Sequence, residues 1–371
     1  MGLTITPQSA IDEYFESDAI SQSDLKLLLG GLKNFLANQD ETSPVNYYEE
    51  KTHLLLGSAI DMKLTGREED FANTYHVSAD LEDKPSGTEM SLIQQVVDEL
   101  RNEGVLSQVD KLADCWNMLA IACVDQQYYK GNPGDKRMNS LIEKGEAYFQ
   151  DVKAAEGKQV ISKEEYATIM QVCDSLRHNQ KTAELFNRDA ITHREDIHVI
   201  YQKIIYFTYK GKRCRAMLDI VIEFLDEEGN IKSVLALDLK TKNGDVLDFG
   251  QSVKSWRYDI QAAWYFLALQ HAYGTGCPSI QIDGFKFIVE STTSPGFPQI
   301  FKASSDLISL GRNGREAQKV PGTDVTYKEI IGYSQLMDDY IFYESINFAY
   351  DRRLEGKDID FEFELYWDKI V

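Results

Sequence analysis

A change of sequence pattern near residue 197 constrains the fold of this chain more than any other feature. Residues 197–209, 214–224 and 231–239 are rich in β-branched and aromatic residues, and the second run alternates along its length. Short turn-forming sequences around Gly211 and Gly229 separate the three runs. Runs of this kind joined by short turns are typical of neighbouring antiparallel strands. The pattern therefore predicts a three-stranded meander.

The sequence on both sides of the meander is mostly helical in pattern. Before residue 190, apolar residues recur at helical spacing, and Ser21 and Ser162 stand where helix N-caps are expected. Further elements are predicted after the meander: a helix over 255–271, strands over 285–290 and 299–303, and a helix over 327–350. We therefore predict an α/β (α+β) fold, in which a helical part packs against a sheet-containing core.

This pattern also predicts how the chain is divided. We expect a mainly helical N-terminal part over 1–190, an α/β core over 191–305 and a C-terminal helical part over 306–371. Because no segment has the composition of a linker, these parts are expected to pack as one integrated domain.

The charge of the chain is unfavourable for binding nucleic acid. The formal net charge is −21 at pH 7, whereas contacts to phosphate rely on Lys and Arg. Residues 202–265, however, hold ten Lys and Arg against nine Asp and Glu, so this segment carries +1 and the remainder −22. A bound divalent cation would offset repulsion further.

Composition and motifs exclude several other classes of protein. The five cysteines are scattered and form no CxxC pair, which argues against a disulfide framework and against a zinc or iron–sulfur site. There is no Gly-rich phosphate loop of an ATPase motor. The first residues lack the features of a signal peptide, and no apolar run reaches the roughly 18 residues of a membrane span. We expect a soluble, cytoplasmic protein with no membrane partner.

Two acids and a lysine fall on adjacent predicted strands. Asp238 and Lys240 lie two residues apart and so point to one face of their strand, while Asp219 lies on the preceding strand. If the hairpin places the two carboxylates side by side, they repel unless a cation or a proton intervenes. Mg²⁺ binds one or two carboxylates and keeps sites for water and phosphate oxygens. The pattern favours a Mg²⁺ site that activates water, with Lys240 holding that water or neutralising charge.

The helix that follows adds a polar stripe. Tyr258, Gln261 and Tyr265 recur at spacings of three and four residues and therefore share one face. They would position water and phosphate at the metal site, although tyrosines on a half-buried helix are more often core residues. Likewise, Asp-x-Lys alone occurs on many exposed strands. Only the order and spacing of the whole set favour a functional site.

The set Asp219, Asp238-Leu239-Lys240 and Gln261 with Tyr265 resembles the PD-(D/E)xK nuclease superfamily. Within it, the chain is similar to phage and prophage exonucleases of the RecE type (exonuclease VIII), and more distantly to RecB-type nuclease domains. This resemblance implies a restriction-endonuclease-like core with a central mixed β-sheet flanked by helices.

The resemblance also implies roles for individual residues. Asp219 and Asp238 would bind Mg²⁺, for which Mn²⁺ may substitute, together with the backbone carbonyl of Leu239. Lys240 would orient the attacking water, and Gln261 with Tyr265 would order the site around the phosphate. Relatives often have a metal-binding histidine where this chain has Asp61. Asp61 is therefore either a further metal ligand or a solvent-facing helix residue.

The function implied is a Mg²⁺-dependent exonuclease that digests linear double-stranded DNA from its ends, 5′ to 3′, in phage-type recombination. Its partners would be DNA ends, a single-strand annealing protein and further copies of itself in a ring. Two alternatives stay open. One is an endonuclease of the same superfamily, and the other is a non-catalytic DNA- or protein-binding module on the same fold, which the net charge favours.

Overall fold

A computed structural model of the protein describes residues 2–39, 48–79, 85–129, 134–274, 280–319 and 326–348. Two compact units emerge, one made of Met1–Gly57 with Asp174–Val371 and the other of Ser58–Cys173. The predicted segments 1–190, 191–305 and 306–371 cut the chain at other positions, and that division stays a prediction. The last predicted segment and the helix expected over 327–350 also extend beyond the described residues.

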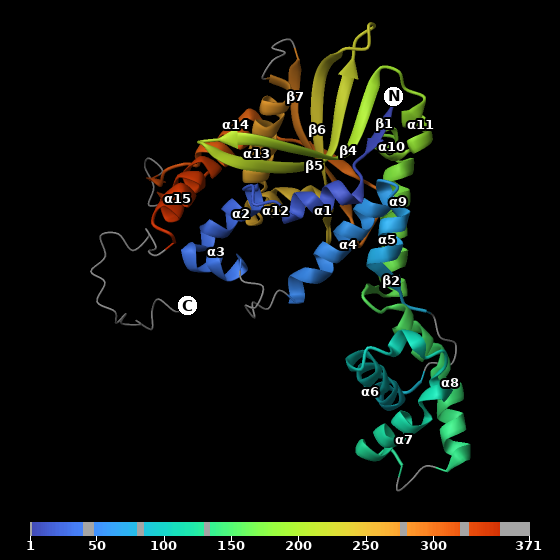
Figure 1. Ribbon diagram of the computed structural model, residues 1–371. Coiled ribbons are helices and arrows are strands. Elements are labelled where there is room, and N and C mark those ends of the chain that lie inside the picture. Colours follow the sequence, from blue (N-terminus) through green and yellow to red (C-terminus); the bar gives the residue numbers. More distant parts are fainter. Residues whose placement is uncertain are drawn as a thin grey trace, which may run out of the picture. The chain divides into compact units, whose positions relative to one another are not determined.

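The larger unit is built on a six-stranded mixed sheet (Figure 1). Its strand order is β1-β4-β5-β6-β7-β8, with parallel pairing of β1 with β4 and of β6 with β7 and antiparallel pairing elsewhere. The strands are β1 Leu3–Ile5, β4 Ile197–Tyr209, β5 Lys212–Leu225, β6 Ile231–Lys242, β7 Gln281–Ser291 and β8 Gln299–Lys302. The predicted meander is β4-β5-β6, and the mixed sheet flanked by helices confirms the predicted fold class.

Helices before and after the meander flank this sheet. Those wholly in the larger unit are α1 Gln8–Glu16, α2 Gln22–Leu27, α3 Leu32–Gln39, α10 Ala183–Phe186, α11 Arg188–Thr192, α12 Phe249–Ser255, α13 Tyr258–Leu269, α14 Ser305–Asn313 and α15 Tyr333–Ser345. A two-stranded sheet joins β9 Gln318–Lys319 to β10 Thr326–Tyr327. The helix predicted over 255–271 begins instead at Tyr258 as α13 and continues as a π-helix over Gln270–Gly274. Arg257 adopts a left-handed conformation with φ of 52° and separates α13 from α12.

The smaller unit is mainly helical. Its elements are α5 Glu68–Thr74, β2 Tyr75–Val77, α6 Gly87–Asn102, α7 Trp116–Asp125, α8 Asp135–Ala154 and β3 Gln159–Ile161. The apolar faces of α6, α7 and α8 bury a shared core that includes Leu92, Val96 and Phe149. Two helices, α4 Tyr48–Leu64 and α9 Lys163–His178, contain residues of both units.

Helix starts follow the predicted caps. Ser21 accepts a hydrogen bond from the Asp24 backbone N–H, and the Asp24 side chain accepts one from the Ser21 N–H, which forms a capping box at α2. Ser162 and Glu165 exchange the same pair of bonds at the start of α9. Such caps satisfy backbone donors that a helix leaves unpaired. Both starts could therefore be predicted from local sequence.

The core of the larger unit lies between the sheet and α13. Trp264 is fully buried in it, and its indole N–H donates to the backbone carbonyl of Arg215 at 3.0 Å. Ala262, Ala263 and Ala268 let the helix approach the sheet closely because their side chains are small. Since α13 is buried around most of its circumference, its few polar side chains are held in fixed positions.

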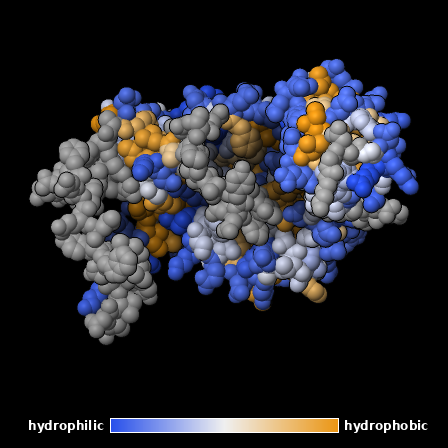
Figure 2. Space-filling model, turned by 90° about the horizontal axis from the view of Figure 1, so that it is seen from below, coloured by the Kyte–Doolittle hydropathy of each residue, from blue (hydrophilic) through white to orange (hydrophobic). Residues whose placement is uncertain are grey.

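The surface is predominantly polar. The face seen in Figure 2 is mostly hydrophilic, with hydrophobic residues in separate patches. No helix in the described part of the chain is long and apolar enough to cross a membrane. The four described cysteines, Cys115, Cys123, Cys173 and Cys214, are buried and form no disulfide with one another, while Cys277 lies outside the described residues.

Candidate metal and phosphate site

The carboxylates of the candidate site lie where strands β5 and β6 separate. The antiparallel ladder between them runs to the pair Ile220 and Leu237 and ends there. One step further, the same register sets Asp219 opposite Asp238. Strand β6 continues alongside β7 through Lys242. The expectation that the hairpin brings the two acids together is therefore met by the register itself.

A second break lies on the other side of Asp219. On β4, the residue opposite Asp219 is Gln202, which is buried and adopts a left-handed conformation with φ of 55°. The ladder pairs Tyr201 with Ile220 and Lys203 with Leu218 but skips this position. Such a conformation is unfavourable for a residue with a side chain, and strain of this kind is often found at functional sites. Asp219 thus lies beside an interruption on both neighbouring strands.

These breaks also change which side chains share a face. Strict alternation along β5 would set Val221 on the opposite face from Ala216 and Leu218. Val221 enters the same hydrophobic core as Ala216 and Leu218, so the alternation shifts by one residue between 218 and 221. The left-handed Gln202 accounts for the shift, because a kinked strand twists its partner with it.

Asp238 is the most buried acid of the site, with 1% of its surface exposed. Its Oδ1 accepts a hydrogen bond from the Gln261 amide at 2.8 Å. Its Oδ2 lies 2.5 Å from Nζ of Lys240 as an ion pair, but no donor among the described residues is aligned with it as a hydrogen bond. Burial raises the pKa of Asp238, and the charge of Lys240 opposes that rise.

Lys240 is held by negative charge. Burial disfavours its protonated form, yet the carboxylates of Asp238 and Asp219 outweigh burial and raise the pKa of Lys240. Its Nζ also lies 4.9 Å from the centre of the Tyr258 ring, in a cation–π contact. Asp219 in turn accepts a hydrogen bond from the Leu239 N–H at 2.9 Å. The lysine is therefore a fixed positive charge between two acids.

Helix α13 supplies the amide and the phenol. The Gln261 Nε2 group donates to Asp238 and also to the Tyr265 hydroxyl, the latter at 3.3 Å. Burial, followed by the charges of Asp238 and Asp219, raises the pKa of Tyr265 well above its usual value. Tyr265 therefore stays protonated and can donate a hydrogen bond. The structure brings together Asp219, Asp238, Lys240, Gln261 and Tyr265, and their metal-binding and catalytic roles stay predictions.

The residues present suit a hard divalent cation. Two carboxylates lie side by side, and one buried oxygen of Asp238 lacks an aligned donor. Mg²⁺ requires few protein carboxylates because water and phosphate fill its other positions. In the described part of the chain, no group of three or more His, Cys, Asp or Glu residues forms a metal cluster. Two neighbouring carboxylates would suit a water-rich Mg²⁺ site better than a closed structural metal site, and Mg²⁺ binding stays a prediction.

Asp61 and Leu239 complete the predicted ligands. Asp61 lies on α4 within the smaller unit, where Arg67 donates to its Oδ2 in an ion pair. Leu239 pairs with Ile288 of β7, and its backbone carbonyl belongs to the strand segment between Asp238 and Lys240. The metal-binding roles of Asp61 and of the Leu239 carbonyl stay predictions.

Lys26 lies near the site and was not predicted to belong to it. Lys26 donates to the Trp256 backbone carbonyl at 3.3 Å, and burial followed by the charge of Lys240 lowers the pKa of Lys26 to about 8. The Trp256 side chain is 52% exposed, which suits stacking on a base. Arg257, by contrast, is bound by Asp259 at 3.0 and 2.9 Å. The only sequence signal for Lys26 was its place at the end of the capped helix α2.

Comparisons with known proteins add little to this geometry. No protein-family model matches the sequence, and no curated protein matches it at a significant level. A crystal structure from Eubacterium rectale, described as a "Putative exonuclease", matches with a TM-score of 0.37 and 14% identity, over 82% of this chain and 80% of that chain. A likeness of this size supports no conclusion about this chain, so the site is interpreted from its own residues.

Proposed function

We propose that this protein is a Mg²⁺-dependent nuclease that hydrolyses phosphodiester bonds of DNA. One observation carries the proposal: two acids and a lysine meet where β5 and β6 separate, and Gln261 fixes the orientation of the buried acid. A structural ion pair with Lys240 needs only one carboxylate, and the second adds negative charge that a bound divalent cation would offset.

Each residue of the site has a part in this reaction. Asp219 and Asp238 would hold the cation, with the Leu239 carbonyl as a further ligand. Bound Mg²⁺ would supply a more acidic water and would stabilise charge on the phosphate. Lys240, whose ammonium lies beside Asp238, would orient the attacking water. Gln261 holds Asp238 in place, and the protonated Tyr265 would donate a hydrogen bond to a phosphate oxygen.

The finer proposal is an exonuclease that acts 5′ to 3′ on linear duplex DNA, passes its single-strand product to an annealing protein and assembles into a ring. It rests on the resemblance to RecE-type exonucleases. The exposed Trp256 ring near the site suits contact with the base at a strand end.

Three DNA substrates distinguish the candidate functions. Purified protein is incubated with linear duplex, nicked circular and covalently closed circular DNA, with Mg²⁺ or with EDTA. We expect Mg²⁺-dependent loss of the linear duplex alone. Cutting of closed circles would instead identify an endonuclease. Binding of DNA without loss of any substrate at micromolar protein would identify the non-catalytic module that the net charge favours.

Strand polarity needs a second assay. A linear duplex labelled at one 5′ end or at one 3′ end, with a phosphorothioate block at a chosen end, reports which strand is digested. Early release of the 5′ label and protection by a 5′ block are the results expected for 5′-to-3′ digestion. Early release of the 3′ label would overturn the polarity without affecting the proposed nuclease activity.

A further inference from the structure

A groove lies on the side of α13 that faces away from the candidate metal site. Helices α13 and α14 lie side by side (Figure 1) and approach closely where Gly311 meets the backbone of Asp259. Elsewhere they leave a groove of about 690 Å³ that β7, β8 and Tyr333 also line. This volume is within the range of roughly 300–1,000 Å³ of sites for small ligands.

The groove is separate from the site already described. Its α13 residues are Ala263, Phe266 and Leu267, whereas Gln261 and Tyr265 face Asp238. At 100° per residue, the two sets project from opposite sides of the helix. A ligand in the groove would therefore not occupy the carboxylate site.

The lining of the groove is positively charged, although the chain is strongly acidic. Two exposed cations, Lys302 and Arg312, line it, and no Asp or Glu does. No ion pair joins either cation to an acid among the described residues. The whole chain carries 60 Asp and Glu against 39 Lys and Arg. A groove whose charged lining residues are all cations, with no acid paired to them, is therefore unusual for this molecule.

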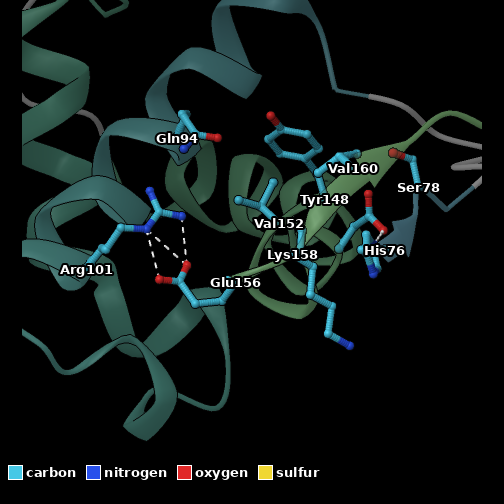
Figure 3. Close-up of a pocket in the computed structure, with 12 residues that line it drawn as sticks. His76, Ser78, Gln94, Arg101, Tyr148, Val152, Glu156, Lys158 and Val160 are labelled. Atoms are coloured by element: carbon cyan, nitrogen blue, oxygen red, sulfur yellow. Dashed lines mark hydrogen bonds and ion pairs between the residues drawn. The ribbon is translucent and has the colours of Figure 1, made fainter. Parts of the chain in front are cut away.

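Another cavity among the described residues has a lining whose charges are neutralised. It lies in the smaller unit, has a volume of about 510 Å³ and is shown in Figure 3. There Arg101 pairs with Glu156 at 2.8 Å, and His76 pairs with Asp151 at 2.7 Å. Because its own acids already partner these groups, that cavity offers little net attraction to an anion, whereas the α13–α14 groove does.

The remaining lining of the groove indicates the chemistry of the ligand. Hydroxyl groups of Ser304, Ser305 and Ser309 and the amides of Gln270 and Asn313 can hydrogen-bond to phosphate or sugar. Apolar surface from Phe266 and Ile308, both partly exposed, can cover a flat ring. Cations, hydroxyls and apolar surface in one groove match a nucleotide better than an acidic peptide, which carries no ring.

We propose that the α13–α14 groove binds a nucleotide phosphate, either of a free nucleotide or of a single DNA strand, through Lys302 and Arg312. This site does not depend on the proposed nuclease function, because it shares no residue with the metal site.

Binding in EDTA tests the groove while any Mg²⁺-dependent cleavage is suppressed. The probes are fluorescent thymidylate, thymidine, inorganic phosphate, a six-nucleotide oligothymidylate and hexaglutamate. We expect the Lys302→Glu/Arg312→Glu double variant to weaken binding of thymidylate or oligothymidylate at least tenfold. If a single DNA strand is the ligand, the plot of log binding constant against log salt concentration also becomes less steep, by ~0.7 per lost phosphate contact. Stronger binding of the mononucleotide identifies a free nucleotide as the ligand.

Two further variants keep the result interpretable. Arg188→Glu is a control that reverses the charge of a single exposed arginine on α11, outside the groove. It should leave binding unchanged. Ser309→Trp blocks the groove without changing charge and should weaken binding as well. Equal binding by the groove variants and Arg188→Glu would overturn the proposal, and so would hexaglutamate or inorganic phosphate binding as tightly as thymidylate. Thermal unfolding of each variant checks that it is folded.

Discussion

The two ends of the paired stretch between β5 and β6 carry partly or fully buried carboxylates in opposite circumstances. At one end, Glu223 is paired in the ladder with His198 on β4 and Val234 on β6. One of its oxygens lies 2.8 Å from Nδ1 of His198, and the other accepts from the Tyr273 hydroxyl at 2.5 Å. Both oxygens have partners within the protein, so this carboxylate is structural.

At the other end, both ladders are interrupted beside Asp219, and the acid opposite it is Asp238. An oxygen of Asp238 has Lys240 as an ionic partner but no aligned donor. The comparison shows that the acid within continuous strand pairing has internal partners for both oxygens, whereas the acid beside the separated strands has an oxygen without an aligned donor. Changes at each end should therefore affect different properties: activity at Asp238 and stability at Glu223.

The largest effect is expected at the separated end. Lys240→Ala and Asp238→Asn should each lower the cleavage rate of linear duplex DNA by roughly 10²–10⁴-fold, because each removes a group that acts in the transition state. Lys242→Ala, two residues along the same strand, is the matched control and should keep near wild-type rates. Initial rates in Mg²⁺ provide the measurement. A Lys240→Ala variant as active as Lys242→Ala would remove the lysine from the mechanism.

The paired end should respond in stability instead. Glu223→Ala leaves the buried Tyr273 hydroxyl and His198 without their partner. We expect the free energy of unfolding to fall by about 3 kcal/mol, the loss typical of breaking a buried polar network. Urea unfolding measures this change, and the cleavage rate per folded molecule should be retained. Loss of activity without loss of stability would contradict the contrast between the two ends.

Gln202, the left-handed residue opposite Asp219, connects stability with activity. At Gln202, with its φ of 55°, a β-branched side chain is strongly disfavoured, so Gln202→Val should cost about 2 kcal/mol of stability. It should also lower activity, because Asp219 lies directly opposite. Gln202→Gly, which tolerates this conformation, should retain more activity than Gln202→Val. Unfolding and cleavage-rate measurements on both variants test this ranking of their activities. Equal activity of Gln202→Gly and Gln202→Val would show that the left-handed conformation of residue 202 does not position Asp219.

The smallest effect concerns Lys26 and pH. Its pKa falls from 10.5 to about 8 on folding because of burial and, next, the charge of Lys240. Between these values the unfolded chain binds a proton that the folded protein has lost, so the Lys26 contribution to stability rises with pH. Lys26→Met should abolish that rise between pH 8 and 10.5. Unfolding in EDTA at several pH values measures it, and an unchanged pH profile would show that Lys26 is not desolvated.

Much of the candidate site could be predicted because it depends on local periodicity. Strand alternation put Asp238 and Lys240 on one face, and helical spacing aligned Gln261 with Tyr265. The short turns of the meander fixed which strands are neighbours, so Asp219 could be set near Asp238. The capping boxes of α2 and α9 are equally local, since each involves residues three positions apart.

Other parts of the site depend on contacts that a single sequence does not reveal. Nothing in the residue type of Gln202 indicates a left-handed conformation, because that φ is imposed by the surrounding sheet. Lys26 meets the site across more than 200 positions of sequence, through its bond to the Trp256 carbonyl. The short strand β1 was also missed: its three residues form a strand only by pairing with β4.

The interruption at Gln202 and Asp219 has a consequence for changes in chain length. Beyond it, β4 and β5 form an arm that turns at Lys210 and Gly211. Adding one residue to each strand of this arm keeps every side chain of residues 219–225 on its present face, whereas adding a single residue to one strand shifts the register. Paired insertions and deletions at the tip of the hairpin can therefore be tolerated while the spacing between Asp219 and Asp238 is preserved.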